Sequence, residues 1–514
     1  MTANLYAALC PAPFSPDRAA LYCPDGETIT YGDLDRQSAR LAHRLVALGV
    51  EPGDRVAVQA GKSARALILY LACLRAGAVY LPLNSGYTRA ELEYFITDAQ
   101  PRLLVVAPAE EAGLRALAEG AGAALLTLSD DGAAGTLLDG VAGLPDRFDT
   151  VERQADDLAA ILYTSGTTGR PKGAMLSHGN LHSNAATLAR EWRFGPEDVL
   201  LHALPIYHTH GLFVATNVSL LSRAAIRLLP KFDLDAIFAA LPRASVMMGV
   251  PTFYTRLLAD PRLTAEAAGH MRLFVSGSAP LLAQTHREWE DRTGHRILER
   301  YGMTETNMNT SNPYAGERRP GTVGPPLPGV EIRVVEPDTG EALPRGEIGM
   351  IEVRGPNVFQ GYWRKAEQTE AEFRPDGYFI TGDLGRLDAD GYVEIVGRGK
   401  DLVISGGLNV YPKEVEQELD ALDAVVESAV IGLPHADLGE AVTAVVEARP
   451  NAGLGADADA EQEALEQAIM SALRERLAGF KLPKRVLFVD ALPRNAMGKV
   501  QKNLLRERHA SLYG

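Results

Sequence analysis

Residues 158–173 read LAAILYTSGTTGRPKG, an apolar run followed by a hydroxyl- and glycine-rich segment. Glycines let the backbone approach an anion closely, successive amide groups can form a concave nest, and Ser, Thr and Lys side chains add further donors. A P-loop would require Gly-Lys-Ser/Thr, whereas Lys172 follows a proline and precedes a glycine. A flexible surface loop fits poorly, because four Ser/Thr residues, three glycines and one lysine stand within ten positions. The segment therefore predicts a phosphate-binding loop after a buried strand.

Four further motifs follow in the chain. They read RYGMTE at residues 300–305, YFITGD at 378–383, GRGKD at 397–401 and PRNAMGK at 493–499. Together with the first segment, and in the same order, they resemble the signature of the adenylate-forming superfamily, which comprises acyl-CoA synthetases, luciferases and the adenylation domains of peptide synthetases. Five ordered matches make this resemblance highly specific. It implies an enzyme that uses ATP to activate a carboxylic acid as an acyl-adenylate.

The charge of the chain is unevenly distributed. The net charge of −15 over 514 residues argues against nucleic-acid binding, yet residues 474–508 carry +7 and the remainder −22. A basic stretch on an acidic protein suits a polyphosphate ligand such as ATP or CoA, and a solvated helix face explains it equally well. The expected partners are therefore small molecules and not nucleic acid.

The apolar segments of the chain are short. The longest, Ala66 to Leu74, has nine residues, whereas a membrane span needs about 20. The N-terminus lacks the basic and apolar regions of a secretion signal, and three scattered cysteines cannot make a disulfide framework. We expect no membrane span and a reducing, cytoplasmic compartment.

Strand-like and helical patterns alternate through the first 300 residues, as in strand 55–58, helix 64–75 and strand 103–106. Such alternation predicts parallel sheets with crossover helices. From about Gly321 the runs become short and punctuated by turns, which predicts a small antiparallel barrel or sheet. The predicted fold is α/β, with a large N-terminal domain over 1–397 that includes a small β-barrel at about 321–397. A mobile α+β lid over 398–514 would follow a hinge at Lys400, and the resemblance implies that this lid rotates between two half-reactions.

The resemblance also implies roles for single residues. Lys499 would bridge the substrate carboxylate and the phosphate, Glu305 would bind Mg²⁺, and Thr304 would donate to the α-phosphate. Lys499 is in addition a candidate target of a lysine acetyltransferase. Residues at CoA-binding positions are Lys400, Gly406 and Gly407. The positions that would bind ATP, with Tyr301 stacked on adenine and Asp383 and Arg398 on the ribose, are Thr164, Ser165, Gly166, Thr167, Thr168, Gly169, Lys172, Ser276, Gly277, Ser278, Ala279, Arg300, Tyr301, Gly302, Asp383 and Arg398.

The acid is indicated by the segments 205–212, 250–256 and 304–324, which resemble the malonyl-CoA synthetase branch of the superfamily. A dicarboxylate keeps a second charge that does not react, so its pocket must contain a cation, best a bidentate arginine. Arg318 is the first choice for this role, Arg256 the second, and Arg319 could exchange roles with Arg318. Each of these arginines could instead be a surface ion-pair partner. His208 would orient the reacting carboxylate, with Thr209 and Met308 as walls around the methylene group.

The predicted function is synthesis of malonyl-CoA from malonate, ATP and CoA through a malonyl-adenylate, with release of AMP and pyrophosphate. One alternative is an acyl-CoA ligase for another short-chain or aromatic acid. A carrier-protein loader is a second alternative, and its carrier would be a separate partner because the last hundred residues contain no evident Gly-Gly-x-Ser attachment site. A non-catalytic nucleotide-binding protein would be expected to have lost Lys499 or Glu305, and both are present.

Overall fold

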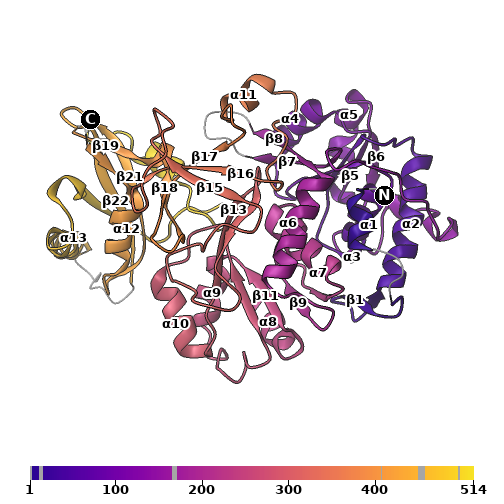
Figure 1. The fold of residues 1–514 in the computed structure, drawn as a ribbon, viewed down its shortest axis with the longest axis horizontal. Coiled ribbons are helices and arrows are strands. Elements are labelled where there is room, and N and C mark those ends of the chain that lie inside the picture. The colour runs from indigo at the N-terminus through magenta and orange to yellow at the C-terminus, as the bar shows by residue number, and fades with distance from the viewer. Residues whose placement is uncertain are drawn as a thin grey trace.

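The computed structural model describes residues 3–10, 15–164, 171–406, 408–449, 458–495 and 498–513. Figure 1 shows two layered α/β parts built from the N-terminal half at the right and bottom, and an α+β part from the C-terminal residues at the left. The predicted α/β class with a separate C-terminal unit is confirmed. None of the helices within the described ranges combines the length and the apolar character that a membrane crossing requires.

The first sheet has six strands in the order β6-β5-β3-β4-β7-β8. All pairs are parallel except β7–β8. These two strands pair antiparallel, and the segment 165–170 lies between them in the chain. Its strands are β3 (Arg55–Gln59), β4 (Val79–Pro82), β5 (Leu103–Val106), β6 (Ala124–Thr127), β7 (Leu158–Thr164) and β8 (Lys172–Ser177). The helices of this part are α1 (Leu5–Leu9), α2 (Tyr31–Ala47), α3 (Ala64–Arg75), α4 (Arg89–Ala99), α5 (Glu111–Gly120) and α6 (His178–Glu191).

The second sheet has eight strands in the order β14-β13-β12-β11-β9-β10-β1-β2. The N-terminal hairpin β1–β2 joins it because β1 pairs in parallel with β10, about 200 positions later in the chain. Its strands are β1 (Ala19–Tyr22), β2 (Thr28–Thr30), β9 (Val199–His202), β10 (Ala225–Leu228), β11 (Val246–Gly249), β12 (Leu273–Ser276), β13 (Leu298–Met303) and β14 (Asn307–Ser311). Its helices are α7 (Asn217–Leu221), α8 (Leu234–Ala240), α9 (Pro251–Leu258) and α10 (Ala283–Thr293).

Two helices explain how the sheets are held together. Helix α3 is apolar on all sides, and every residue from Ala66 to Arg75 is buried, as expected for a helix enclosed by a core. Helix α6 lies between the sheets and contacts β7 and β8 on one side and β14 on the other. It begins with a capping box, in which Ser177 accepts from the backbone N–H of Asn180 and Asn180 accepts in return. Thr30 and Thr88 start α2 and α4 in the same way.

The β-rich segment forms an open four-stranded antiparallel sheet in the order β15-β16-β17-β18. The strands are β15 (Glu331–Val335), β16 (Gly349–Arg354), β17 (Phe379–Leu387) and β18 (Val393–Arg398), with α11 (Ala366–Ala371) between β16 and β17. Within the described residues β15 does not pair with β18, so the expected barrel is not closed. A closed barrel of four strands would leave too little interior for side chains.

The C-terminal part, called the lid below (residues 398–513), is a five-stranded sheet with helices. Its strands are β19 (Val403–Ser405), β20 (Leu408–Val410), β21 (Val425–His435), β22 (Gly439–Ala448) and β23 (Arg485–Val489). Its helices are α12 (Pro412–Asp420), α13 (Ala458–Arg474) and α14 (Lys502–His509). The chain enters the lid through Gly397, whose φ of +153° favours glycine, and through a 3₁₀ turn over Gly399–Asp401.

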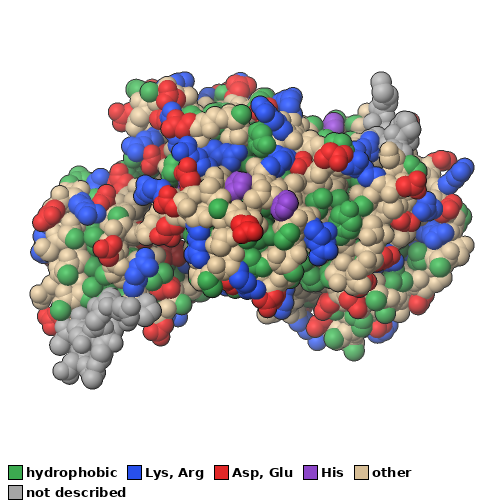
Figure 2. All heavy atoms as spheres, turned by 90° about the horizontal axis from the view of Figure 1, so that it is seen from below, with side chains coloured by type: hydrophobic (Ala, Val, Ile, Leu, Met, Phe, Trp, Pro, Cys, Tyr) green, Lys and Arg blue, Asp and Glu red, His purple; other side chains and the backbone are tan. Residues whose placement is uncertain are grey.

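Short helices complete the described fold. One-turn 3₁₀ segments occupy Pro108–Glu110, Thr136–Leu138, Val141–Gly143, Leu241–Arg243 and Gly479–Lys481, and a π-helix occupies His210–Thr216. On the face drawn in Figure 2, basic and acidic side chains are interspersed over most of the surface. This face therefore lacks the broad basic field that a nucleic-acid surface needs.

Candidate active site

The carboxylate of Glu305 is buried between two hydroxyl groups. Thr164, the last residue of β7, donates from Oγ1 to Glu305 Oε1 at 3.3 Å, and Tyr362 Oη lies 3.0 Å from the same oxygen. Burial raises the pKa of Glu305, and no ion pair of the described residues includes this carboxylate. A buried carboxylate without a counter-ion is costly, and Mg²⁺ prefers hard oxygen ligands of this kind. Glu305 therefore fits a Mg²⁺ ion that phosphate oxygens and water would complete.

Tyr362 and Glu372 join this carboxylate to Lys172, and sequence reasoning missed both. Tyr362 Oη lies 2.7 Å from Glu372 Oε2, and Lys172 forms an ion pair with Glu372. The Lys172 ammonium also stands 4.0 Å from the centroid of the Tyr362 ring. The structure thus places Lys172, which opens β8, near the predicted metal carboxylate. The sequence offered no signal for this except that Tyr362 follows a glycine near a run of turns.

Strand pairing brings Asp383 opposite Arg398. They face each other across β17 and β18, and Arg398 Nε lies 2.7 Å from Asp383 Oδ1. Tyr301 Oη donates to the other carboxylate oxygen of Asp383. Each oxygen retains capacity for a further donor, such as a ribose hydroxyl. The structure therefore brings together three residues that were predicted to contact the nucleoside, from β13, β17 and β18.

Lys499 lies near this same group. Its backbone N–H donates to Asn495 Oδ1 at 3.0 Å, and Gly498 beside it has a φ of +75°. Burial lowers the pKa of Lys499, and the nearby Arg398 lowers it further, whereas Asp383 and Asp401 oppose this shift. Because the side chain stays accessible to solvent, we interpret it as lining an open cleft. The lid thus carries its predicted catalytic lysine to the Asp383–Arg398 pair.

Arg300 is a buried guanidinium with unused donors. It is 3% exposed, and its Nε and Nη2 have no hydrogen-bond partner among the described residues. It lies against Gly277, where an added Cβ would stand 2.4 Å from Arg300 Cζ, so a side chain at this position would displace the guanidinium. Burial lowers the pKa of Arg300 to about 9. Such a guanidinium is suited to a carboxylate or phosphate ligand.

Two histidines adjoin Arg300. His210 Nδ1 lies 3.2 Å from Ser278 Oγ, and His208 Nδ1 accepts from the backbone N–H of His210 at 3.4 Å. Burial lowers the pKa of His208 to about 4, and Arg300 contributes to the shift, so His208 is neutral at physiological pH. Buried polar groups are normally bonded. In the described chain, however, several here have no partner: His210 Nε2, Thr209 Oγ1, Ser276 Oγ and the two Arg300 nitrogens.

A cavity of about 480 Å³ opens between the two large sheets and the lid. Arg256, on α9, lines it, and Phe232 stacks beside that guanidinium at 5.7 Å from the ring centroid. The cavity reaches Tyr207, the residue before His208, and the lid residues Arg494 and Gly498. The structure therefore places Arg256 where a ligand can reach it.

Arg318 and Arg319 have other partners. Arg318 donates to the backbone carbonyls of Arg296, Tyr314 and Pro313 at 2.6, 2.8 and 3.1 Å. Arg319 pairs with three carboxylates, those of Glu317, Asp388 and Asp390. Neither lines the cavity. The structure does not bring the first-choice arginine of the sequence to the cavity, because its donors are taken by its own loop and by the segment before β13.

The remaining predicted residues occupy the following positions. Met308 is buried against Gly302, and Thr304 lies in the turn after β13. Lys400 lies in the 3₁₀ turn, where burial lowers its pKa, and Gly406 has a φ of +58° and donates to Leu438 O at 2.8 Å. Ala279 follows Ser278 in the bend after β12. Ser165, Gly166, Thr167, Thr168, Gly169 and Gly407 lie outside the described residues.

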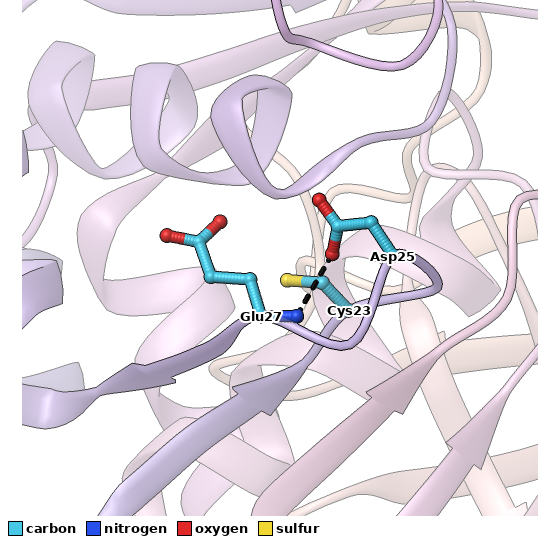
Figure 3. A group of neighbouring side chains, drawn as sticks. All are labelled: Cys23, Asp25 and Glu27. Carbon is cyan, nitrogen blue, oxygen red and sulfur yellow. Dashed lines mark hydrogen bonds between the residues drawn. The ribbon is translucent and has the colours of Figure 1, made fainter.

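A second cluster, Cys23, Asp25 and Glu27, lies in the turn between β1 and β2 (Figure 3). Asp25 accepts from the backbone N–H of Glu27 at 3.0 Å, and Cys23 and Glu27 pair through their backbones, so hairpin geometry accounts for the grouping. Burial raises the pKa of the Cys23 thiol to about 11, which keeps it protonated at neutral pH. We therefore interpret the cluster as a turn.

The predicted nucleotide-binding side chains, the lid lysine and the two-part fold fit an adenylate-forming enzyme. The chain belongs to the AMP-binding enzyme family: the family's model matches residues 12–363, and that of the AMP-binding enzyme C-terminal domain matches 414–499. The predicted superfamily is thereby confirmed.

Individual relatives narrow this class. The chain is 35% identical over 544 residues to a malonate–CoA ligase of Arabidopsis thaliana, covering 98% of this chain and 88% of that one. It is 37% identical over 492 residues to a feruloyl-CoA synthase of an Amycolatopsis species, covering 94% of each. ATP-bound MatB from Rhodopseudomonas palustris superposes with a TM-score of 0.96 at 60% identity over 100% of both chains. A benzoate CoA ligase from Burkholderia xenovorans superposes at 0.88 with 29% identity, covering 98% and 99%.

Proposed function

We propose that this protein is an AMP-forming malonate–CoA ligase, which makes malonyl-CoA from malonate, ATP and CoA through a malonyl-adenylate. The observation that carries the proposal is the pair of guanidinium groups at the site: Arg300 is buried with unused donors, and Arg256 lines the neighbouring cavity. A monocarboxylate with an apolar tail would leave the buried Arg300 guanidinium without a charged partner. The malonate–CoA ligases among the relatives, together with the likeness to MatB, support the same substrate.

In the first half-reaction, the substrate carboxylate attacks the α-phosphate and pyrophosphate leaves. Two anions meet in this step, so preorganised cations supply much of the rate. Lys499 would bridge the carboxylate and the phosphate, and Thr304 would donate to the phosphate. Asp383, fixed by Arg398 and Tyr301, would accept from the ribose hydroxyls. Tyr301 would thus orient Asp383 in addition to packing against the adenine.

The Glu305 carboxylate would hold Mg²⁺, which when bound neutralises phosphate charge. Thr164 and Tyr362 fix the orientation of this carboxylate through their hydroxyl groups. Lys172 and the described ends of β7 and β8 lie beside it, on either side of the glycine-rich segment. The metal and the phosphates would accordingly bind next to each other, between Glu305 and the glycine-rich segment.

In the second half-reaction, the CoA thiol displaces AMP from the acyl-adenylate. The region around Lys400 and Gly406 would contact the pantetheine arm after the lid has turned about Lys400. We place the boundary between the two domains at 1–397 and 398–514. The end of β18 at Arg398 and the 3₁₀ turn over Gly399–Asp401 support this division. The cavity beside Arg256 would receive the acyl part of the substrate.

Within the pocket, we assign the distal carboxylate of malonate to Arg256 and Arg300 in place of Arg318 and Arg319. His208, neutral and next to Arg300, would orient the substrate as a hydrogen-bonding group without adding charge.

Two other proposals concern the compartment and a modification of Lys499. The compartment is the cytoplasm, although several malonate–CoA ligase relatives are mitochondrial. Lys499 is accessible to a lysine acetyltransferase.

The experiment that tests this function is pyrophosphate release with ATP and Mg²⁺ across malonate, methylmalonate, succinate, acetate, octanoate and benzoate, each with and without CoA. CoA-dependent turnover confined to malonate and its close relatives is the expected result. Preference for a monocarboxylate would leave the adenylation chemistry intact and contradict the substrate. Absence of release with every acid would contradict the activity itself.

A further inference from the structure

Lys62 is a partly buried lysine that none of the steps above uses. It lies in the loop between β3 and α3, two residues before the first residue of that helix. Its Nζ donates to the backbone carbonyl of His202 at 2.7 Å and lies 3.1 Å from His202 Nδ1. His202 is the last residue of β9, in the other large sheet. The contact therefore joins the loop after β3, in one large sheet, to the end of β9, in the other.

The hydrogen bonds of His202 determine its role in this contact. His202 Nε2 lies 3.0 Å from the carbonyl oxygen of Gly211, which can only accept, so Nε2 carries the hydrogen. Nδ1 is then an acceptor and takes a hydrogen from Lys62. His202 is buried, and its pKa is lowered well below the usual value by burial and by Lys62. It therefore gives Lys62 a hydrogen-bond acceptor and no negative charge.

Lys62 also lacks a counter-ion within the described part of the chain. Burial lowers its pKa well below the usual value, and no carboxylate offsets the effect. An ammonium has three hydrogens, of which His202 accepts two. One donor direction is thus left over on a charged group that is costly to bury alone.

The surroundings of Lys62 show where a partner can enter. Lys62 lines the cavity of about 480 Å³, together with Lys231, Arg256 and Arg494, and none of the lining residues that the structure describes is Asp or Glu. Four cationic side chains, of which Arg494 is already paired with Glu427, thus line one space that is large enough for a small dianion or the end of a longer ligand. An oxyanion in this cavity would supply the counter-ion that Lys62 lacks.

We propose that Lys62, held by His202, binds an oxyanion of a substrate in this cavity alongside Arg256. The inference rests on the proposed function and deepens it. The oxyanion has two sources within the reaction: the distal carboxylate of malonate, or a phosphate group of CoA. Both make the same charge-assisted hydrogen bond to an ammonium.

The test compares Lys62→Met and Lys62→Gln with the parent enzyme and with Lys484→Met, which removes an exposed lysine of the lid that does not line the cavity. Methionine removes the charge and keeps an unbranched side chain only one atom shorter, whereas glutamine retains a donor for His202. Three quantities are measured for each: the KM and kcat of malonate in pyrophosphate release, the calorimetric affinity for malonate with a non-hydrolysable ATP analogue, and the KM of CoA. Far-ultraviolet circular dichroism checks folding.

If the distal carboxylate is the partner, both Lys62 variants raise the KM of malonate and its dissociation constant by about tenfold or more, with the KM of CoA unchanged. If a CoA phosphate is the partner, the KM of CoA rises instead, and the difference from the parent disappears when pantetheine replaces CoA. Lys484→Met changes neither quantity.

Two results separate failure of this inference from failure of the proposed function. A folded Lys62→Gln enzyme with parental constants for both malonate and CoA would overturn the inference, even if Lys62→Met fails to fold. Parent enzyme that turns over a monocarboxylate and not malonate would overturn the function, and the CoA and pantetheine comparison would then still decide the assignment of Lys62.

Discussion

Lys499, Asp383 and Arg398 show what single residues can reveal from sequence. Their motifs predicted that they act on ATP, and the structure brings the three side chains near one another. The direction in which the Arg318 side chain points, in contrast, depends on the carbonyls that accept from it. These belong to residue 296, before β13, and to residues 313 and 314, after β14. Tertiary contacts decide which of several nearby arginines faces the cavity, so the sequence left Arg256 as the second choice.

Lys499→Ala is expected to abolish pyrophosphate release and largely to spare thioester formation from preformed malonyl-adenylate. The reason is that Lys499 is assigned to the charge that develops in the first step, where loss of one preorganised donor costs about 10²–10³ in rate. Single-turnover assays of each half-reaction measure this. Equal loss in both steps would contradict the assignment.

Arg256→Ala is expected to raise the KM of malonate by about tenfold to a hundredfold, because one charge-assisted partner of the distal carboxylate is lost. Arg318→Ala serves as the matched control, since Arg318 donates only to backbone carbonyls in the described structure and should affect stability more than substrate preference. The ratio of malonate to acetate turnover measures the effect. A change in this ratio for Arg318→Ala and not for Arg256→Ala would return the role to the original candidate.

At the scale of elements, periodicity predicted most of the parallel framework. Strand 55–58, helix 64–75 and strand 103–106 correspond to β3, α3 and β5, because apolar runs with clear ends leave few alternatives. The sequence did not reveal that β1 pairs with β10, since this pairing depends on a contact between residues about 200 positions apart. It also suggested a barrel where four strands form an open sheet.

Helix α12 ends at a carboxyl group that links lid stability to pH. Asp420 is 9% exposed, accepts from Ser428 Oγ at 2.7 Å, and has its pKa raised by burial from 3.8 to about 7. The folded state therefore holds the proton more tightly than the unfolded chain between about pH 4 and pH 7, so this group makes the protein less stable as the pH rises through that window.

Asp420→Asn is expected to remove this contribution, because the amide keeps an acceptor for Ser428 and cannot ionise. The difference in melting temperature between variant and parent should grow in favour of the variant from pH 4 to pH 7 and then level off. Thermal unfolding followed by circular dichroism over this range measures it. A constant difference at all pH values would show that Asp420 titrates as it does in the unfolded chain.

At the scale of the whole molecule, the site is assembled from both parts of the chain. Lys499 and Gly498 come from the lid, whereas Glu305, Arg300 and Arg256 come from the N-terminal part, in the turn after β13, in β13 and in α9. The sequence motifs indicated that the chain has an N-terminal part and a lid, and that both carry residues of the site. They could not indicate that Gly498 stands over Thr252, where an added Cβ would lie 3.1 Å from its Oγ1, because this is a contact between parts that fold around separate cores.

Lys400→Pro is expected to separate the two half-reactions. Lys400 lies in a 3₁₀ turn, whose φ of about −60° a proline can adopt, and proline would restrict rotation to other backbone angles. Pyrophosphate release should persist, and thioester formation from malonyl-adenylate should fall by about a hundredfold or more. Lys400→Ala is the control, because it removes the side chain and leaves the backbone free. If the alanine variant loses as much as the proline variant, the side chain and not the rotation is responsible.

Because Arg494 and Gly498 form one wall of the cavity proposed to bind the acid, that cavity is shared between two modules of the protein. An inhibitor shaped to fill it would bind a single arrangement of the lid and would trap the enzyme there, blocking thiol entry as well as acid binding. For the same reason, exchanging the lid for that of a relative should alter acid selectivity even when every residue of the two large sheets is retained. Efforts to redesign the accepted acid therefore need to vary residues on both sides of the hinge together.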